Sequence, residues 1–386
     1  MVEWKKLGEI AQLQKNRNKK HVTEKAYSIT QAGLVPTKSF FKEKTNITSS
    51  DTSGYYIVKK DWFVYSPSRI DVGSINYLKE EGPVIVSPID VVFSIDGAKC
   101  SPSYLLNYFF TYEGKKKLLR NREGVEGMGR RNLPFDAIKN ITIPIPSLSE
   151  QERIVGILDT FTAGIDNLKE QIALRRKQYE YYREQLLDLE GKEGVEMKTL
   201  GELGKCFAGA TPSTNNNKYW DDGTIPWMSS GEVHQGIVTH TASYITQEGY
   251  DNTSTKMLPI NTIVIALAGQ GKTRGSVAIT AIKLCTNQSL CGIVIENADI
   301  VNKYIYYYLK TRYNDLRRIS SGDGTRGGLN LKMVGSYFVP IVTLQEQQRI
   351  VSILDTFEAS ISNLEAQLEQ REKQYEYYRN KLLTFE

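Results

Sequence analysis

The side chains best suited to chemistry lie in two basic, glycine-rich segments, residues 120–134 and 317–330. At an offset of 196 residues Arg130 falls on Arg326, so both segments hold one arginine in register. A guanidinium offers two parallel N–H donors to a phosphate or to the edge of guanine, and glycines let a backbone approach closely. These segments are our first candidates for contact with a nucleic acid. The alternative is a pair of solvated surface loops.

Other basic residues would extend such a contact along a nucleic acid backbone. The chain has 49 basic and 44 acidic residues, a net charge of +5, which weakly favours a polyanionic partner. Each basic side chain taken alone is typical of an ordinary protein surface. The predicted DNA contacts are Lys15, Arg17, Lys19, Arg130, Arg131, Lys272, Arg274, Thr325 and Arg326.

The sequence offers little to a catalytic mechanism. Residues 266–273 end like a phosphate-binding loop, but Ala266 replaces the first glycine, and Gly275 interrupts the helix that should follow. His234 and His240 have no zinc-ligand pattern around them. The four cysteines are scattered, and we find no serine nucleophile elbow, amino-methyltransferase tetrapeptide or nuclease carboxylate–lysine cluster. We therefore expect a binding scaffold without catalytic residues, metal or cofactor of its own.

The elements that must position these loops include two long helices of nearly the same sequence. Residues 149–187 align without a gap to residues 345–383, with 25 of 39 positions identical. Apolar residues step by four and three along both, which predicts a coiled-coil seam. The partner nearest to each helix is the other copy, and pairing between two chains is the competing interpretation. The predicted seam begins Ile154, Leu158, Phe161, Ile165 and Leu168 in one copy, and Ile350, Leu354, Phe357, Ile361 and Leu364 in the other.

Both helices also repeat residues that lie off this seam. Near the far ends the pairs are Tyr181 with Arg183 and Tyr377 with Arg379. A solvated helix face is the simplest interpretation. Their presence in both copies favours two equivalent docking surfaces for one kind of partner.

Each helix is preceded by a domain of mixed α/β character, so we expect an α+β protein. The predicted boundaries are residues 1–147 for the first domain, 148–190 for its helix, 191–196 for a linker, 197–343 for the second domain and 344–386 for its helix. The edges of the two domains match in sequence, whereas residues 18–101 and 207–300 share no defensible alignment. A kept framework with changed interiors indicates two different readers of a two-part, asymmetric target. Late in each domain we expect a tyrosine-rich helix, over residues 102–119 and 301–319.

Taken together, these features resemble the specificity subunit of a type I restriction-modification system. The resemblance covers the whole chain and is most specific at residues 148–159 and 344–355, which open with Leu-x-Glu-Gln-x-Arg-Ile-Val. Inside the second domain, residues 209–212, 225–227 and 324–326 are also similar to the family. The first domain lacks Pro-Trp and has a different loop.

The resemblance implies more than the residues show. Each domain would be a target-recognition domain for one half of a split DNA sequence, and the two helices would pair antiparallel as a spacer. The chain would dock two methyltransferase (modification) subunits that use S-adenosylmethionine to methylate adenine, and restriction subunits that use ATP and Mg to cleave DNA. We expect a cytoplasmic protein, since the opening residues lack a signal peptide and no long apolar run appears. Two alternatives remain open: an adaptor that joins proteins through a coiled-coil spacer without binding DNA, and a self-contained nuclease or methyltransferase.

Overall fold

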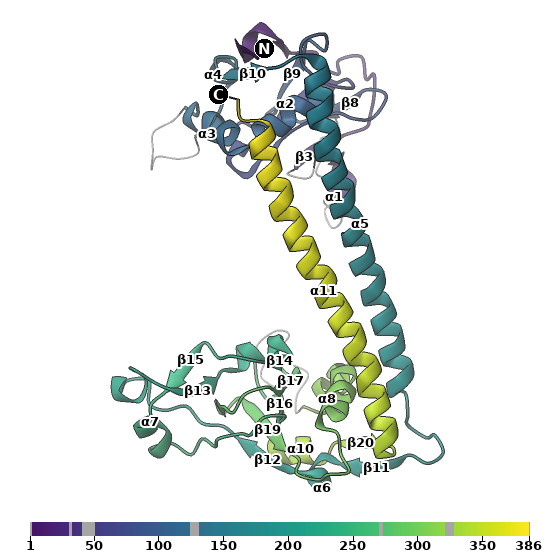
Figure 1. The fold of residues 1–386 in the computed structure, drawn as a ribbon, viewed down its shortest axis with the longest axis vertical. Coiled ribbons are helices and arrows are strands. Elements are labelled where there is room, and N and C mark those ends of the chain that lie inside the picture. The colour runs from purple at the N-terminus through teal and green to yellow at the C-terminus, as the bar shows by residue number, and fades with distance from the viewer. Residues whose placement is uncertain are drawn as a thin grey trace. The chain divides into compact units, whose positions relative to one another are not determined.

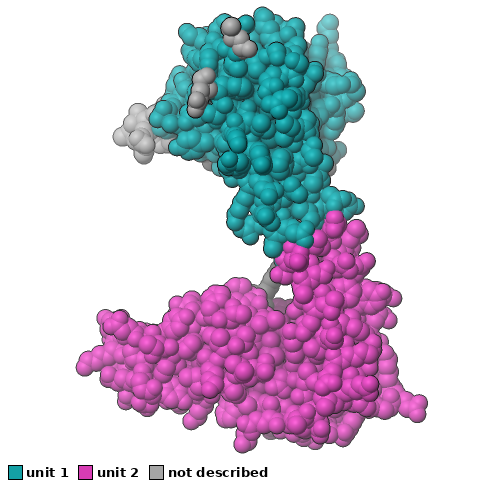
Figure 2. Space-filling model, viewed as in Figure 1, with its two compact units in different colours: residues 1–170, 365–386 teal, residues 171–364 magenta. Residues whose placement is uncertain are grey.

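The computed structural model describes residues 2–30, 33–40, 51–123, 131–269, 273–320 and 328–385. The chain forms two compact units, coloured separately in Figure 2. Unit 1 contains residues 1–170 and 365–386, and unit 2 contains residues 171–364. Each unit therefore consists of one mixed α/β domain and parts of both long helices.

The two long helices are α5 (Leu148–Leu187) and α11 (Leu344–Leu382), of 40 and 39 residues. They pack against each other within both units (Figure 1). In unit 1, Phe161 stacks on Tyr378 with ring centroids 5.3 Å apart. Further along, Lys169 lies 3.2 Å from Glu372. The numbering rises on one helix while it falls on the other, so the pair is antiparallel, as the resemblance implies.

Unit 1 is built around a four-stranded sheet in the order β2-β9-β6-β7. β9 pairs antiparallel with both β2 and β6. The strands of this unit are β1 (Glu3–Lys6), β2 (Ala11–Gln14), β3 (Tyr27–Thr30), β4 (Gly33–Pro36), β5 (Tyr56–Val58), β6 (Phe63–Tyr65), β7 (Ile75–Tyr77), β8 (Val84–Val86), β9 (Val91–Ile95) and β10 (Thr142–Ile145). Its short helices are α1 (Thr37–Phe40), α2 (Pro102–Phe109), α3 (Tyr112–Arg120) and α4 (Phe135–Ile138).

Unit 2 has a five-stranded sheet in the order β12-β19-β16-β17-β14 and a three-stranded sheet in the order β15-β13-β18. Its strands are β11 (Glu196–Thr199), β12 (Lys205–Ala208), β13 (Ile225–Met228), β14 (Ile237–Val238), β15 (Ser243–Ile245), β16 (Ile263–Ala266), β17 (Val277–Thr280), β18 (Cys285–Thr286), β19 (Leu290–Val294) and β20 (Phe338–Ile341). Its short helices are α6 (Leu200–Leu203), α7 (Gln247–Asp251), α8 (Asn302–Thr311), α9 (Tyr313–Ile319) and α10 (Leu331–Gly335).

The matching sequence edges of the two domains pair with each other inside each unit. β1 runs antiparallel to β10 from Glu3 opposite Ile145, and β11 runs antiparallel to β20 from Glu196 opposite Ile341. The strand that closes each domain leads directly into a long helix. The shared framework is thus a two-stranded ribbon that joins each domain to the start of its helix.

A buried glutamine fixes the start of each long helix on its domain. The amide of Gln151 donates to the carbonyl oxygens of Lys99 and Pro146 and accepts from the Ser101 N–H, at 2.9, 2.9 and 2.8 Å. Gln347 makes the same three contacts in unit 2, to Asp299, Val342 and Val301, at 3.1, 2.9 and 2.9 Å. Both side chains are 0% exposed. We call this contact set the glutamine clamp.

The tyrosine-rich segments are each two helices, so the prediction of one continuous helix is wrong. In unit 1 the break comes at Thr111, whose hydroxyl caps α3 by accepting from the Gly114 N–H at 3.0 Å. A Cβ at Gly114 would lie 2.0 Å from the carbonyl oxygen of Tyr108, so only glycine permits this tight turn. In unit 2, Arg312 separates α8 from α9.

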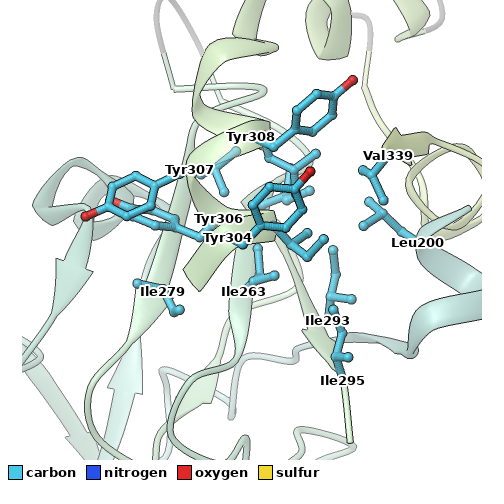
Figure 3. Close-up of a cluster of buried hydrophobic side chains, with 14 of the residues drawn as sticks. Leu200, Ile263, Ile279, Ile293, Ile295, Tyr304, Tyr306, Tyr307, Tyr308 and Val339 are labelled. Carbon is cyan, nitrogen blue, oxygen red and sulfur yellow. The ribbon is translucent and has the colours of Figure 1, made fainter. Parts of the chain in front are cut away.

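The tyrosines of these helices belong mainly to the core. In unit 2, Tyr304, Tyr306, Tyr307 and Tyr308 are buried against strand residues such as Ile263 (Figure 3). The hydroxyl of Tyr304 donates to the Pro340 carbonyl at 2.6 Å. In unit 1, Tyr104 donates to Pro144 in the same way, at 2.9 Å. Buried phenols therefore tie each helix to the framework strand rather than facing a ligand.

The predicted seam has two uses. Ile154 and Leu158 pack in the domain core of unit 1, and Ile350 and Leu354 pack in that of unit 2. Further along the seam the two helices contact each other. Phe161 stacks on Tyr378, and the Arg371 guanidinium lies 5.7 Å from the centroid of the Phe161 ring. In unit 2, Phe357 meets Tyr182 and Arg175 in the same arrangement. The remaining predicted seam residues also lie on the two helices. Ile165, which is buried, and Leu168 belong to α5, and Ile361 and Leu364 belong to α11.

Candidate nucleic-acid interface

One edge of the unit 1 sheet gathers several of the predicted DNA contacts. The strand register places Gln14 opposite Val92 and Tyr65 opposite Val91. The end of β2, the start of β9 and the end of β6 therefore lie together. Residues 15–19 follow β2 at this edge, and the segment after the basic loop is attached here too, since Leu133 donates to the Pro67 carbonyl at 3.1 Å.

Unit 2 has the same edge with different residues. β12 ends opposite the start of β19, with Ala208 paired to Cys291. The family-like segment 209–212 follows β12, where residues 15–19 follow β2 in unit 1. Leu329 donates to the Leu267 carbonyl at 2.9 Å, which matches the bond from Leu133 to Pro67. We name these two places the reading edges of unit 1 and unit 2.

Two family-like motifs of unit 2 support each other at its reading edge. The indole N–H of Trp227 donates to the Ala210 carbonyl at 3.0 Å. Trp227 also meets Trp220 edge to face, with ring centroids 5.1 Å apart. A Cβ at Gly209 would lie 2.0 Å from the Thr286 carbonyl oxygen, so this position requires glycine. The loop is thereby held against the sheet, and the Thr211 hydroxyl is hydrogen-bonded to Gln288.

The basic residues after β2 are exposed, and the side chain of one of them makes several contacts. Lys15, Arg17 and Lys19 all lie on the surface. The Arg17 guanidinium lies 4.6 Å from the Tyr56 ring centroid and donates to the Tyr56 hydroxyl at 3.2 Å. It also donates to the Gly54 carbonyl. A guanidinium that lies over an aromatic ring keeps its charge accessible while the contact restricts its position.

Arg131 lies at the base of the first basic loop. It donates to the Arg122 carbonyl at 3.0 Å, and Arg122 donates back to the Arg131 carbonyl at 3.1 Å. Backbone bonds between Glu123 and Asn132 close the loop below this pair. The Arg131 side chain also borders a basic surface of α3 that contains Lys115, Lys116 and Arg120. These contacts join the two described ends of the segment and place positive charge beside them.

Of the remaining predicted DNA contacts, one is buried and the others lie outside the described residues. Arg274 is only 7% exposed, and its backbone carbonyl accepts from Arg317 at 3.4 Å. The position of Arg274 does not favour a direct phosphate contact. Arg130, Lys272, Thr325 and Arg326 lie outside the described residues.

A cleft at the reading edge of unit 1 contains a residue that sequence reasoning missed. It has a volume of about 710 Å³ and is bordered by Lys15, Tyr56, Asp90 and the segment from Asn132 to Asp136. Asp90 immediately precedes β9 and is 8% exposed. Burial raises the pKa of this carboxyl to about 7. No spacing or motif around Asp90 marks it, because its burial depends on three strands and a loop that are distant in sequence.

The predicted docking residues repeat their geometry in both units. Tyr181 and Tyr377 are each 59% exposed. Arg183 lies over the ring of Tyr179 at 5.3 Å, and Arg379 lies over the ring of Tyr375 at 5.0 Å. Each tyrosine is thus presented beside an arginine that is fixed against its own helix.

The part of the chain that the structure describes holds no group of three or more His, Cys, Asp or Glu side chains arranged to bind a metal ion. Among the same residues, no helix is both long and apolar enough to cross a membrane.

Comparison with known proteins identifies one family. A family model described as "Type I restriction modification DNA specificity domain" matches residues 1–175 and 192–372. The specificity subunit of the EcoR124I/EcoR124II type I restriction enzyme of Escherichia coli is 34% identical over 405 residues, covering 100% of this chain and 94% of the relative.

Solved structures agree on the fold. A type I restriction-modification S subunit from M. genitalium superposes with a TM-score of 0.57 at 16% identity, covering 100% of this chain and 97% of the other. A second structure, from a study of complex assembly and conformational transition of the type I R-M system, has a TM-score of 0.65 at 16% identity over 99% of this chain and 96% of the other. At this identity the likeness concerns the fold alone.

Proposed function

Because the chain belongs to the family of type I restriction-modification DNA specificity subunits, we propose that each reading edge contacts one half of a split, asymmetric DNA sequence. In this family the specificity subunit is non-catalytic, and the enzymatic activity lies in partner subunits. The proposal concerns which residues read DNA and which partners join them.

The observation that carries this proposal is the contrast between the two reading edges. The strands, the loop anchors at Leu133 and Leu329, and the glutamine clamps are the same in both units. The side chains at the edge differ: residues 15–19 are basic in unit 1, whereas residues 209–212 form a compact loop in unit 2. A constant frame with different exposed groups suits a protein that reads two unlike half-sites.

Within this function the predicted contacts take separate roles. Lys15, Arg17 and Lys19 would contact phosphates, because they are exposed next to the edge and two of them carry flexible point charges. Arg131 would support the first basic loop. Arg130, Lys272, Thr325 and Arg326 remain predicted contacts on sequence grounds, and Arg274 would act indirectly, through its own loop.

The partners follow from the family and are part of the proposal. Two modification subunits would dock on the equivalent surfaces around Tyr181 with Arg183 and Tyr377 with Arg379. They would bring S-adenosylmethionine and methylate adenine. Restriction subunits with ATP and Mg would add cleavage, in the cytoplasm where the DNA is. The predicted domain boundaries, with the linker at residues 191–196, belong to the same proposal.

The decisive experiment compares adenine methylation across the genome in two strains. One carries this gene beside its methyltransferase gene, and the other lacks only this gene. We expect one split, asymmetric motif to lose methylation in the second strain. If methylation does not change although the locus is expressed, the purified chain with its modification subunit is tested on random duplexes, and absence of selection there contradicts the proposed function.

A further inference from the structure

The cleft at the reading edge of unit 1 combines an open entrance with a buried acceptor. Its exposed border combines basic and apolar groups with Asn132 and Asp136: Lys15 follows β2, and the Ile89 side chain, beside Asp90, is 75% exposed. Tyr56, on which Arg17 is stacked, forms another part of the wall. Such a surface offers charge to a phosphate and flat or apolar contact to a base.

Asp90 is the unusual group in this cleft. Among the described residues, no hydrogen-bond donor and no cation acts on its carboxylate, and burial is the one cause of its raised pKa. Its own backbone N–H is satisfied by the Ser87 carbonyl at 3.1 Å. The carboxylate oxygens keep some contact with solvent, but with 8% exposure of the residue and no protein donor its charged form is costly. A donor supplied by a ligand in the cleft would remove that cost.

The other charged groups around the cleft do not supply the donor. Lys15 is exposed, and its charge acts on Asp136, whose pKa is lowered mainly by Lys139. Asp136 itself is paired with Lys139 at 2.5 Å and is largely exposed. The Tyr56 hydroxyl accepts from Arg17. Burial alone therefore accounts for the raised pKa of Asp90.

We propose that Asp90 determines specificity in the first half-site by accepting a hydrogen bond from the exocyclic amine of a cytosine. This inference rests on the proposed function. In the major groove cytosine presents its N4 amine as a donor, whereas guanine presents two acceptors that would repel a carboxylate. Adenine presents a donor next to the N7 acceptor, which suits an amide better than a carboxylate.

The corresponding position of unit 2 supports a reading role. The same turn precedes both strands: the Asp90 N–H donates to the Ser87 carbonyl, and the Leu290 N–H donates to the Asn287 carbonyl, so Leu290 corresponds to Asp90. A structural acid needed by the framework would be expected in both units, as the clamp glutamines are. A buried leucine in place of the aspartate shows that the framework does not need an acid here, which fits a position that varies with the base that is read.

The test measures base preference in the complex of this chain with its modification subunit. Duplexes randomised across the first half-site are selected by the wild type, by Asp90→Asn and by the matched control Asp136→Asn, which removes an exposed carboxylate of the same cleft. The wild type is expected to prefer cytosine at one position by about five- to 150-fold. Asp90→Asn should lose this preference and shift it towards adenine, because an amide pairs with adenine N6 and N7. Asp136→Asn should keep it.

Two results would overturn the assignment: unchanged preference at every position in Asp90→Asn, or an equal loss of affinity for all sequences. Asp90→Ser, which removes the carboxylate and leaves a small polar side chain, provides a second variant if the asparagine variant folds poorly, and it should also lose the cytosine preference. A wild type that selects no sequence at all contradicts the proposed function itself, which separates that failure from a wrong role for Asp90.

Discussion

At the scale of single residues, this chain separates groups that hold the fold from groups that remain available. The clamp glutamines and the phenols of Tyr104 and Tyr304 each use their polar atoms inside the protein. Asp90 is 8% exposed, against 0% for those four residues, and has no such use among the described residues. Buried polar groups are normally hydrogen-bonded. The carboxylate of Asp90 is an exception, and we expect it to lower the stability of the free protein for the sake of binding.

The pKa of Asp90 leads to a prediction about stability and pH. The carboxyl has a pKa of about 7 in the folded protein and an ordinary value of 3.8. Between these values the folded state holds a proton that the unfolded state has released, so the free energy of unfolding falls as pH rises from about 4 to about 7. Asp90→Asn removes this loss. The free energy of unfolding of the variant should exceed that of the wild type by on the order of 1 to 4 kcal/mol at pH 8, and by much less at pH 5.

Urea unfolding at both pH values measures this difference. Asp136→Asn is the control, because Asp136 is exposed and its lowered pKa would give no such gain. An Asp90→Asn variant that is less stable than the wild type by the same amount at both pH values would mean that Asp90 stabilises the fold through a hydrogen bond.

Arg17 leads to a prediction about salt. If its guanidinium contacts one phosphate, Arg17→Ala should weaken binding to all duplexes alike and reduce the slope of log affinity against log salt by about 0.9. Binding titrations between low and moderate salt measure this slope. Lys59→Ala is the matched control, since Lys59 also lies over an aromatic ring, that of Trp62, but precedes β6 at the opposite end of the sheet. Equal slopes for the Arg17 variant and the wild type would exclude the phosphate contact.

At the scale of elements, each long helix joins three surfaces: its own domain at its start, the other helix along its middle, and the domain of the other unit at its end. In unit 1 the end of α11 packs in the domain core through Leu383 and Tyr375. In unit 2 the end of α5 does so through Leu187 and Tyr179. The apolar pattern therefore continues to both ends of each helix, because the ends pack against domains while the middle packs against the other helix.

The glutamine clamp should stabilise both units equally. Gln151→Met and Gln347→Met keep the side-chain volume but leave buried backbone groups without partners, at a cost of about 1 to 3 kcal/mol for each group left unsatisfied. Urea unfolding should therefore show a loss of stability that is several times larger than the loss caused by a substitution on the protein surface. Glu152→Gln, an exposed neighbour on α5, serves as control and should change stability by less than about 0.5 kcal/mol. Full stability in either glutamine variant would show that the clamp is not needed.

The aromatic contacts between the helices can be measured as a coupling. In a double-mutant cycle, Phe161→Ala and Tyr378→Ala should couple by about 0.5 to 1.5 kcal/mol, because the rings stack directly. Phe161→Ala combined with Tyr182→Ala is the crossed control, since Tyr182 stacks on Phe357 instead. That combination should be additive. Coupling of equal size in both cycles would mean that the contacts are not specific to one ring pair.

At the scale of the whole molecule, the chain places two reading edges of different chemistry on one repeated framework. The framework strands β1 with β10 and β11 with β20, and the clamps that follow them, recur with the same partners. The reading edges therefore act as separate modules. A change at one of them is expected to leave the other half-site untouched.

Matched substitutions at the two edges test this independence. Asn132→Ala in unit 1 and Gln288→Ala in unit 2 both remove an exposed amide at a reading edge. Sequencing of the methylated motif should show each variant altered in one half only, and the double variant altered in both, with additive costs in affinity. If either single substitution altered both halves, the edges would not be independent readers.

The repeat itself is enough to predict the two long helices and their seams, because the 3.5-residue apolar period and 25 identities in 39 positions are visible in the sequence alone. It leaves open whether the helices pair within one chain or between two chains, and the family follows from the order of domains and helices together. The same pattern could not tell which seam residues face a helix and which face a domain, since an apolar side chain such as Leu158 has the same signature in either place. It also could not place the break at Thr111, which depends on the close approach of Gly114 to Tyr108. The reading edges and the burial of Asp90 arise only when β2, β6 and β9 come together, because strand register brings side by side residues that are distant in sequence.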